Sequence, residues 1–87
     1  MISLTYSKGF LKLARRLPKN LQEKLAKQLE FLQQNPFHPF LHTKLSTGPL
    51  VGFYSFRITR DWRVIFQFKN PEVIKLIGLG HRKDIYR

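Results

Sequence analysis

The alternation of apolar and polar positions divides the first part of the chain into one strand and two helices. Residues 2–6 alternate as an edge strand does. Ser7 is a suitable N-cap for a helix over residues 8–17. Pro18 interrupts that helix and can open a second one, which runs to about residue 34. Each helical segment carries an apolar stripe at helical spacing, so together they predict a helical hairpin with one buried face.

The second half of the chain has the pattern of three consecutive strands. A loop is predicted from NPFHPF through LHTKLSTGP, because Pro36 and Pro39 interrupt regular structure. The runs VGFYSFRI, DWRVIFQF and EVIKLIGL follow, and short turns at residues 59–60 and 69–71 join them into an antiparallel meander. We therefore expect one α+β domain over residues 1–87, in the order β-α-α-β-β-β. Its helical hairpin should cover one face of a small, twisted, mainly antiparallel sheet.

Side chains alternate between the two faces of a strand, so the sequence also assigns each strand residue to a face. The face predicted to pack on the helices carries Tyr54, Phe56, Ile58, Trp62, Val64, Phe66 and Phe68. In the last run Lys75 marks the other side, which we call the open face. The pattern places Arg57, Arg63 and His81 together on the open face. It also leaves an apolar set there, namely Phe53, Ile65, Val73, Ile77 and Leu79.

Charge narrows the range of partners. Sixteen lysines and arginines stand against five acids, which gives a net charge of +11. Such a field attracts polyanions, so nucleic acid is the first partner to consider and an acidic protein is the alternative. The chain has no cysteine, which excludes disulfides and thiolate sites. Its first residues lack the apolar region of a signal peptide, and no apolar run approaches membrane-spanning length. We expect a cytoplasmic protein without a membrane partner.

The residues assigned to the open face suit chemistry on a phosphodiester. An arginine presents a planar, permanently charged fork that matches phosphate oxygens. His81 can take or give a proton near neutrality, and Tyr86 can donate a hydrogen bond or stack on a base. The 2′-hydroxyl of RNA can itself attack the neighbouring phosphorus, so this chemistry needs no cofactor. A purely structural role is the alternative for these residues. The nearby Asp61 would organise the turn of the meander or pair with Arg63.

A metal site is not expected. His38 and His42 are four residues apart, but Pro39 between them removes the helical geometry that would bring both imidazoles to one ion. The glycines do not have the spacing of a loop that cradles a nucleotide phosphate. The sequence therefore predicts neither a metal nor another cofactor.

The order of elements, the stretch YSFRITRDWRVIFQF and the tail GHRKDIYR closely resemble the RelE/ParE superfamily of bacterial and archaeal type II toxins. The likeness extends over nearly the whole chain. Many members are ribosome-dependent mRNA endonucleases that a cognate antitoxin neutralises, whereas the ParE branch poisons DNA gyrase. The resemblance implies an mRNA interferase that inhibits translation. The alternatives are a gyrase poison that acts by binding, or a degenerate member that retains only antitoxin binding.

The resemblance also implies roles for individual residues. Catalytic positions fall on Arg57, Arg63, His81 and Tyr86, and RNA-binding positions fall on Lys44, Arg60, Arg82 and Lys83. One position departs from the pattern, because the lysine that serves as general base in RelE falls at Ser55. His81 is the first substitute as proton acceptor, with Lys44 and Asp61 in reserve. The implied partners are the ribosome with its mRNA and an acidic antitoxin segment that covers the apolar rows of the open face.

Overall fold

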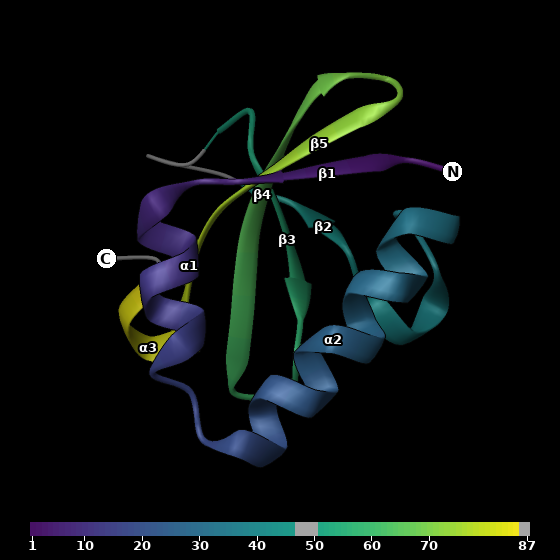
Figure 1. Cartoon of the computed structure of the whole chain (residues 1–87). Helices are drawn as coiled ribbons and strands as arrows, with labels where there is room; N and C mark the ends of the chain where they lie inside the picture. The colour runs from purple at the N-terminus through teal and green to yellow at the C-terminus, as the bar shows by residue number, and fades with distance from the viewer. Residues whose placement is uncertain (47–50, 86–87) are drawn as a thin grey trace.

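The structure is a computed structural model, and it describes residues 1–46 and 51–85. The elements are β1 (Ser3–Tyr6), α1 (Lys8–Arg15), α2 (Lys19–Gln34), the 3₁₀ helix η1 (Pro39–Leu41), β2 (Lys44–Leu45), β3 (Tyr54–Arg57), β4 (Trp62–Asn70), β5 (Val73–His81) and α3 (Arg82–Ile85). Figure 1 shows α1 and α2 beside a curved sheet, with α3 near the end of β5. The predicted helical hairpin and meander are confirmed. The short elements η1 and β2 stand where the sequence indicated only a loop.

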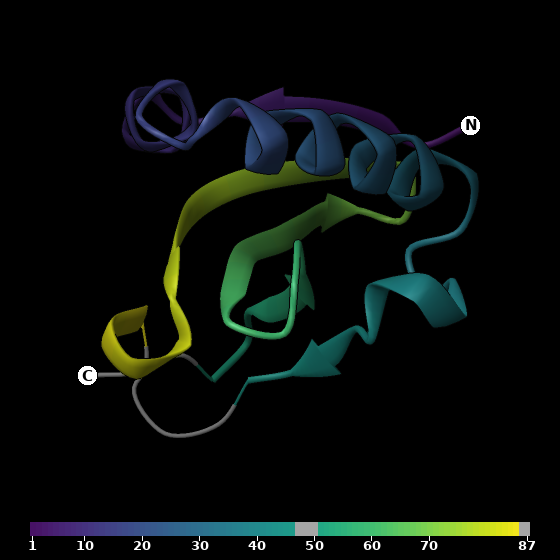
Figure 2. The same cartoon turned by 90° about the horizontal axis from the view of Figure 1, so that it is seen from below.

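The sheet has the strand order β1-β5-β4-β3-β2. β1 runs parallel to β5, and the other neighbouring pairs are antiparallel, so the prediction of a mainly antiparallel sheet is confirmed. Figure 2 shows α1 and α2 on one side of the sheet, which curls so that β3 and β2 turn underneath. The open face is therefore the inner side of this curl.

Local signals in the sequence explain how the helices attach to the sheet. The Ser7 hydroxyl accepts a hydrogen bond from the Phe10 backbone N–H (3.0 Å), which caps α1, and donates one to the Ile77 carbonyl (2.7 Å). The apolar stripes meet the sheet in one core, although Leu13 of the predicted α1 stripe stays exposed. The core consists of Phe10, Leu17, Leu25, Leu32, Leu41, Phe56, Ile58, Val64, Phe66, Ile74, Leu76 and Leu79.

A β-bulge in β5 changes which residues face the core. Ile65 pairs with Gly78 and Phe66 pairs with Leu76, so Ile77 is an extra residue on β5. The alternation is reversed beyond this point, and Leu79 lies in the core. The assignment of Leu79 to the open face is therefore wrong.

The predicted apolar exposure of the open face is also smaller than expected. Ile65 faces that side but is only 4% exposed, because the inner side of the curl encloses it. Phe53, Val73 and Ile77 are half-buried. The open face therefore presents a modest apolar surface.

Gln28 joins three elements across the buried side of α2. Its side chain is only 5% exposed. The Nε2 group donates hydrogen bonds to the carbonyls of Phe40 in η1 (3.1 Å) and Arg57 in β3 (2.8 Å). β2 pairs only with residues 54–55, so the end of β3 is a free sheet edge whose carbonyl needs a donor. Gln28 supplies this donor and fixes the position of η1 and of Arg57.

Replacing Gln28 with methionine should lower the free energy of unfolding by about 2 kcal/mol, because two buried carbonyls lose their donor while the volume is conserved. Urea unfolding followed by circular dichroism measures this change. Gln34→Met is the matched control, since Gln34 is exposed on the same helix. Equal unfolding midpoints for the two variants would contradict the structural role of Gln28.

Candidate functional site

Two arginines face each other across β3 and β4. Arg57 and Arg63 are direct partners in the antiparallel register. Their chain neighbours Phe56, Ile58 and Val64 are in the core, so both arginines point to the open face, as predicted. Like charges directly opposite each other destabilise a strand pair. Two guanidinium groups on one face are also a fit for an oxyanion, so the pair is a candidate anion-binding site.

The surroundings of Arg57 support this interpretation. Arg57 is half-buried, and its Nε atom is buried without a hydrogen-bond partner among the described residues. A buried donor that finds no acceptor within the protein is costly. Phosphate oxygens are acceptors that fit a guanidinium fork. The open face is thus suited to an oxyanion at Arg57.

Lys44 shares the open face with the two arginines. It lies opposite Ser55 in the β2–β3 pairing, and Ser55 in turn lies opposite Ile65 of β4. Ser55 is only 3% exposed, whereas Lys44 is exposed. Lys44 therefore lies next to Ser55, the position at which the resemblance places the lysine of RelE. Of the three predicted substitutes for that lysine, Lys44 is the one that the register places on this face.

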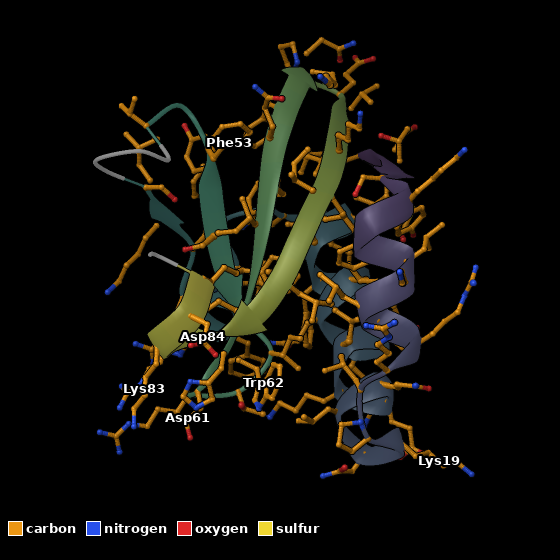
Figure 3. The ribbon with its side chains drawn as sticks, turned by 90° about the vertical axis from the view of Figure 1, so that its left-hand side faces the viewer. Lys19, Phe53, Asp61, Trp62, Lys83 and Asp84 are labelled. Atoms are coloured by element: carbon orange, nitrogen blue, oxygen red, sulfur yellow. The ribbon has the colours of Figure 1, made fainter. Side chains whose placement is uncertain are left out.

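The helix α3 is held at the turn between β3 and β4 by contacts with Asp61. The Arg82 backbone N–H donates to the Asp61 carbonyl (2.7 Å), and the Arg82 Nε lies 3.4 Å from the Asp61 carboxylate. Figure 3 shows Asp61 and Lys83 at this end of the sheet. Asp61 thus pairs with Arg82 and not with Arg63. Since it is engaged there, it is a poor candidate for the proton acceptor.

Gly80 of β5 lies close to the last residue of α3. It is the register partner of Arg63, and a Cβ built on Gly80 would lie 3.8 Å from the Cβ of Ile85. Ile85 therefore packs over the strand next to Arg63. Sequence analysis did not identify this contact, although a glycine inside a strand is a signal of close approach. The predicted catalytic residue Tyr86 follows Ile85 directly and lies outside the described residues.

His81 is not on the open face, so its predicted grouping with the arginines is wrong. The bulge at Ile77 makes His81 the register partner of Trp62 on the helix-covered side, and the two rings are in edge contact (centroids 5.8 Å apart). The His81 Nδ1 accepts a hydrogen bond from the Lys83 backbone N–H (3.1 Å). This bond caps the start of α3. The geometry therefore favours a positioning role for His81.

The remaining predicted residues are at the surface. Arg60 is exposed in the turn between β3 and β4, and Lys83 is exposed on α3. His38 caps η1 by accepting from the Phe40 backbone N–H (3.1 Å), and its ring stacks on Phe31. Within residues 1–46 and 51–85, no three potential metal ligands of the His, Cys, Asp or Glu type come together. Over the same residues, no helix is long and apolar enough to cross a membrane.

Comparison with known families gives a match over almost the whole chain. A family model described as "ParE toxin of type II toxin-antitoxin system, parDE" matches residues 3–86. No protein with a curated functional description matches the chain in sequence.

Several solved structures share the fold. A YoeB/ParE toxin from Agrobacterium tumefaciens has a TM-score of 0.78 at 16% identity, covering 93% of this chain and 99% of that chain. YafQ from E. coli has a TM-score of 0.78 at 18% identity, with 100% of both chains covered. The archaeal RelE–RelB complex from Pyrococcus horikoshii OT3 gives a TM-score of 0.76 at 24% identity, covering 95% of this chain and 97% of that chain. These similarities confirm the predicted fold class.

Proposed function

We propose that this chain, which belongs to the family of ParE toxins of type II toxin–antitoxin systems as the resemblance to the RelE/ParE superfamily predicted, cleaves messenger RNA on the ribosome. The observation that carries this proposal is the Arg57–Arg63 pair on the open face. Two guanidinium forks side by side provide the charge and the donors that a phosphodiester requires. The protein would act in the cytoplasm, where it inhibits translation.

In the proposed reaction the 2′-oxygen of one ribose attacks the adjacent phosphorus, and the bond from phosphorus to the 5′-oxygen of the next nucleotide breaks. The products are a 2′,3′-cyclic phosphate and a 5′-hydroxyl. One proton leaves the 2′-hydroxyl, and another is delivered to the departing 5′-oxygen. Arg57 and Arg63 hold the non-bridging oxygens and stabilise the negative charge that grows on them in the transition state.

We assign the proton transfer to the open face. Lys44 stands on this face opposite Ser55, so its amine can reach a nucleotide held by the arginines. Tyr86 orients the nucleotide in this proposal, as the resemblance implies; the residue before it, Ile85, lies close to Gly80 of β5. His81 caps α3 in this proposal and thereby positions that helix. Arg60, Arg82 and Lys83 contribute contacts to RNA phosphates.

We further propose that a cognate antitoxin binds this protein. Solved relatives include a RelE–RelB complex from Pyrococcus horikoshii OT3 and a YoeB–YefM complex from Staphylococcus aureus. The net charge of +11 favours an acidic partner segment. The half-buried apolar side chains of Phe53, Val73 and Ile77 give that segment a place to pack.

A gyrase poison is the second candidate, and the observation that favours it is the description of the matching family model as ParE. Inducible expression with mapping of transcript 5′ ends separates the two functions. The nuclease predicts new 5′-hydroxyl ends inside translated reading frames, whereas a transcript without a start codon stays intact. Intact messages accompanied by accumulated DNA-cleavage complexes would instead support the gyrase poison. A variant carrying both Arg57→Ala and Arg63→Ala is the control for cleavage by host enzymes.

A further inference from the structure

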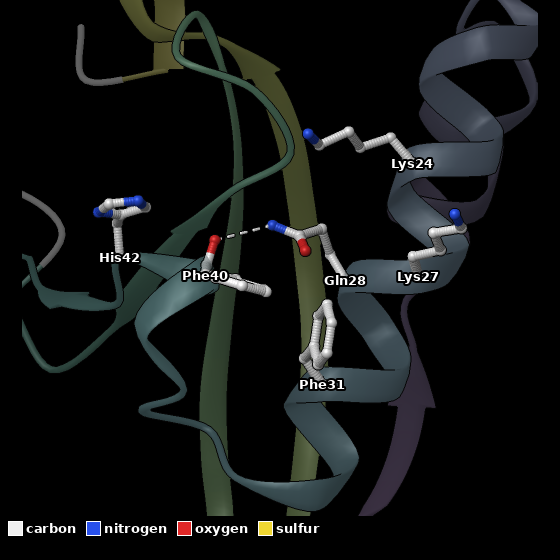
Figure 4. A pocket seen from close by; sticks show the side chains of 6 residues that line it. All are labelled: Lys24, Lys27, Gln28, Phe31, Phe40 and His42. Atoms are coloured by element: carbon white, nitrogen blue, oxygen red, sulfur yellow. Dashed lines mark hydrogen bonds between the residues drawn. The ribbon is translucent and has the colours of Figure 1, made fainter.

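A groove separates α2 from η1, on the side of the molecule where β3 ends. Its volume is about 520 Å³, which is in the range of ligand-binding pockets, and a smaller hollow of about 150 Å³ continues it toward the turn between β3 and β4. Figure 4 shows the larger part, with Lys24 and Phe31 on the α2 side and Phe40 on the η1 side. We call the two hollows together the α2–η1 groove. Its lining residues are Lys24, Lys27, Gln28, Phe31, Phe40, His42, Arg57, Ile58, Thr59 and Arg60.

The charge of the α2–η1 groove has one sign. Lys24 and Lys27 are exposed, and within the described part of the chain neither forms an ion pair. Arg57 and Arg60 are among the residues that line the smaller hollow. None of the described residues that line the groove is acidic. A concave surface of one sign concentrates counter-ions, so the groove attracts a polyanion.

An aromatic ring is exposed among these cations. Phe40 is 64% exposed, although a phenylalanine is among the residues most often buried. Its position is fixed, because the Gln28 amide holds its carbonyl and the Phe31 ring lies against its edge (centroids 5.5 Å, 82°). Exposed aromatic rings next to lysines are the combination by which proteins bind single-stranded nucleic acid, since a base stacks on the ring.

The backbone at the rim of the groove is strained. His42 ends η1 in the left-handed conformation, with φ 51° and ψ 45°. Asparagine or glycine adopts this conformation at lower cost than histidine does. Strain of this kind is found at ligand sites, where it holds a side chain in a required place. Here it places the imidazole of His42 at the rim.

We propose that the α2–η1 groove binds a single-stranded segment of the RNA, with one base stacked on Phe40 and its phosphates on Lys24 and Lys27. The groove is continuous with the proposed cleavage site through Arg57, which lines the smaller hollow and is the cross-strand partner of Arg63. An RNA strand that passes Arg57 therefore enters the groove. The inference rests on the proposed function in one respect: the RNA in the α2–η1 groove is the same RNA that is cleaved at Arg57 and Arg63.

The test measures binding of a short, fluorescently labelled 2′-O-methyl RNA to the full-length protein by fluorescence anisotropy. This RNA has no free 2′-hydroxyl, so binding is observed without cleavage. Phe40→Ala should weaken binding about tenfold, because a base loses its stacking partner. Replacing Lys24 and Lys27 together with alanine should reduce the slope of log affinity against log salt by about 1.4, for two lost phosphate contacts.

Matched controls separate the groove from general attraction to a basic protein. Phe37→Ala removes another exposed phenylalanine, which lies against Tyr54 and Phe68 outside the groove. Lys12→Ala removes an exposed lysine from α1. Both controls should leave RNA affinity within about twofold of the wild type, as expected for surface substitutions away from a site. His42→Asn should keep the stability of the fold, since asparagine tolerates this backbone, while lowering RNA affinity.

Several results would overturn the inference. One is an equal loss of affinity in the control variants. Another is an unchanged affinity and salt slope in the variants of Lys24 and Lys27, which keep the packing of η1 intact. A third is an acidic peptide of equal charge whose binding depends on Phe40 as strongly as the RNA does. If groove variants weaken RNA binding but the wild-type protein cleaves no message in cells, the groove stands and the proposed nuclease function fails.

Discussion

Replacing Arg63 with alanine is expected to lower the single-turnover rate of RNA cleavage by about 10²–10³-fold, because a preorganised donor to the developing oxyanion is lost. Arg63 is the cross-strand partner of Arg57, and in the proposed function both contact the same phosphate. The effect should appear in the rate of bound complexes more than in ribosome association, since charge grows in the transition state. Co-sedimentation with ribosomes and single-turnover cleavage, measured on the same preparations, test this expectation.

The stability of the Arg63→Ala variant gives an independent signature. Removing one of two like charges that stand opposite each other relieves repulsion, so the stability of this variant, measured as its unfolding midpoint, is compared with its cleavage rate. Arg63→Lys keeps the charge but loses the planar fork, and it should recover only part of the rate. Arg15→Ala, which removes an exposed arginine from α1, should leave cleavage unchanged. A collapse of ribosome association with a normal rate on bound complexes would make Arg63 a docking residue.

The sequence predicted the fold wherever a regular period continued without interruption. The stripes of α1 and α2, the alternation of β3 and the alternation of β4 as far as Phe68 keep their periods. The placement of Arg57 and Arg63 on one face could be predicted for this reason. β5 contains one extra residue at Ile77. An alternating sequence pattern does not indicate where a bulge inserts such a residue. His81 was assigned to the wrong face because it lies beyond this bulge.

The α2–η1 groove could not be predicted for a different physical reason. Its residues come from α2, η1 and the end of β3, and only the tertiary contact made by Gln28 brings these elements together. The lysines at positions 24 and 27 are three apart on a helix, a spacing that puts them on one side of it. Nothing in the pattern placed the loop residue Phe40 opposite them. Cavities between elements depend on such contacts and not on local periodicity.

The choice between Lys44 and His81 as the proton-transfer group follows from the faces of the sheet. Lys44 lies on the open face opposite Ser55, whereas the ring of His81 packs on Trp62 on the helix-covered side. A general base must come within hydrogen-bond reach of the proton that it accepts. The Nδ1 of His81 is also occupied by the bond from the Lys83 N–H. Lys44 satisfies the geometric requirement better.

Lys44→Gln is therefore expected to reduce the single-turnover cleavage rate about 10²-fold, the ordinary contribution of one positioned acid or base. The remaining rate should depend less on pH, because the group that accepts the proton is gone. His81→Asn should retain most of the activity, since the asparagine side-chain oxygen can accept the same bond from the Lys83 N–H and keep α3 capped. His81→Ala cannot form this bond and should be less active than His81→Asn. Rates across a range of pH, measured on purified variants with ribosome-bound message, distinguish these outcomes.

Two controls define what these rates mean. Lys19→Gln makes the same chemical change at an exposed position at the start of α2, and it should leave the rate and its pH dependence unchanged. Circular dichroism confirms that each variant is folded. If His81→Asn loses as much activity as His81→Ala while Lys44→Gln cleaves at the wild-type rate, the proton passes through His81. The end of β5 must then turn over when RNA binds, because the cap that His81 makes on α3 holds its ring away from the arginines.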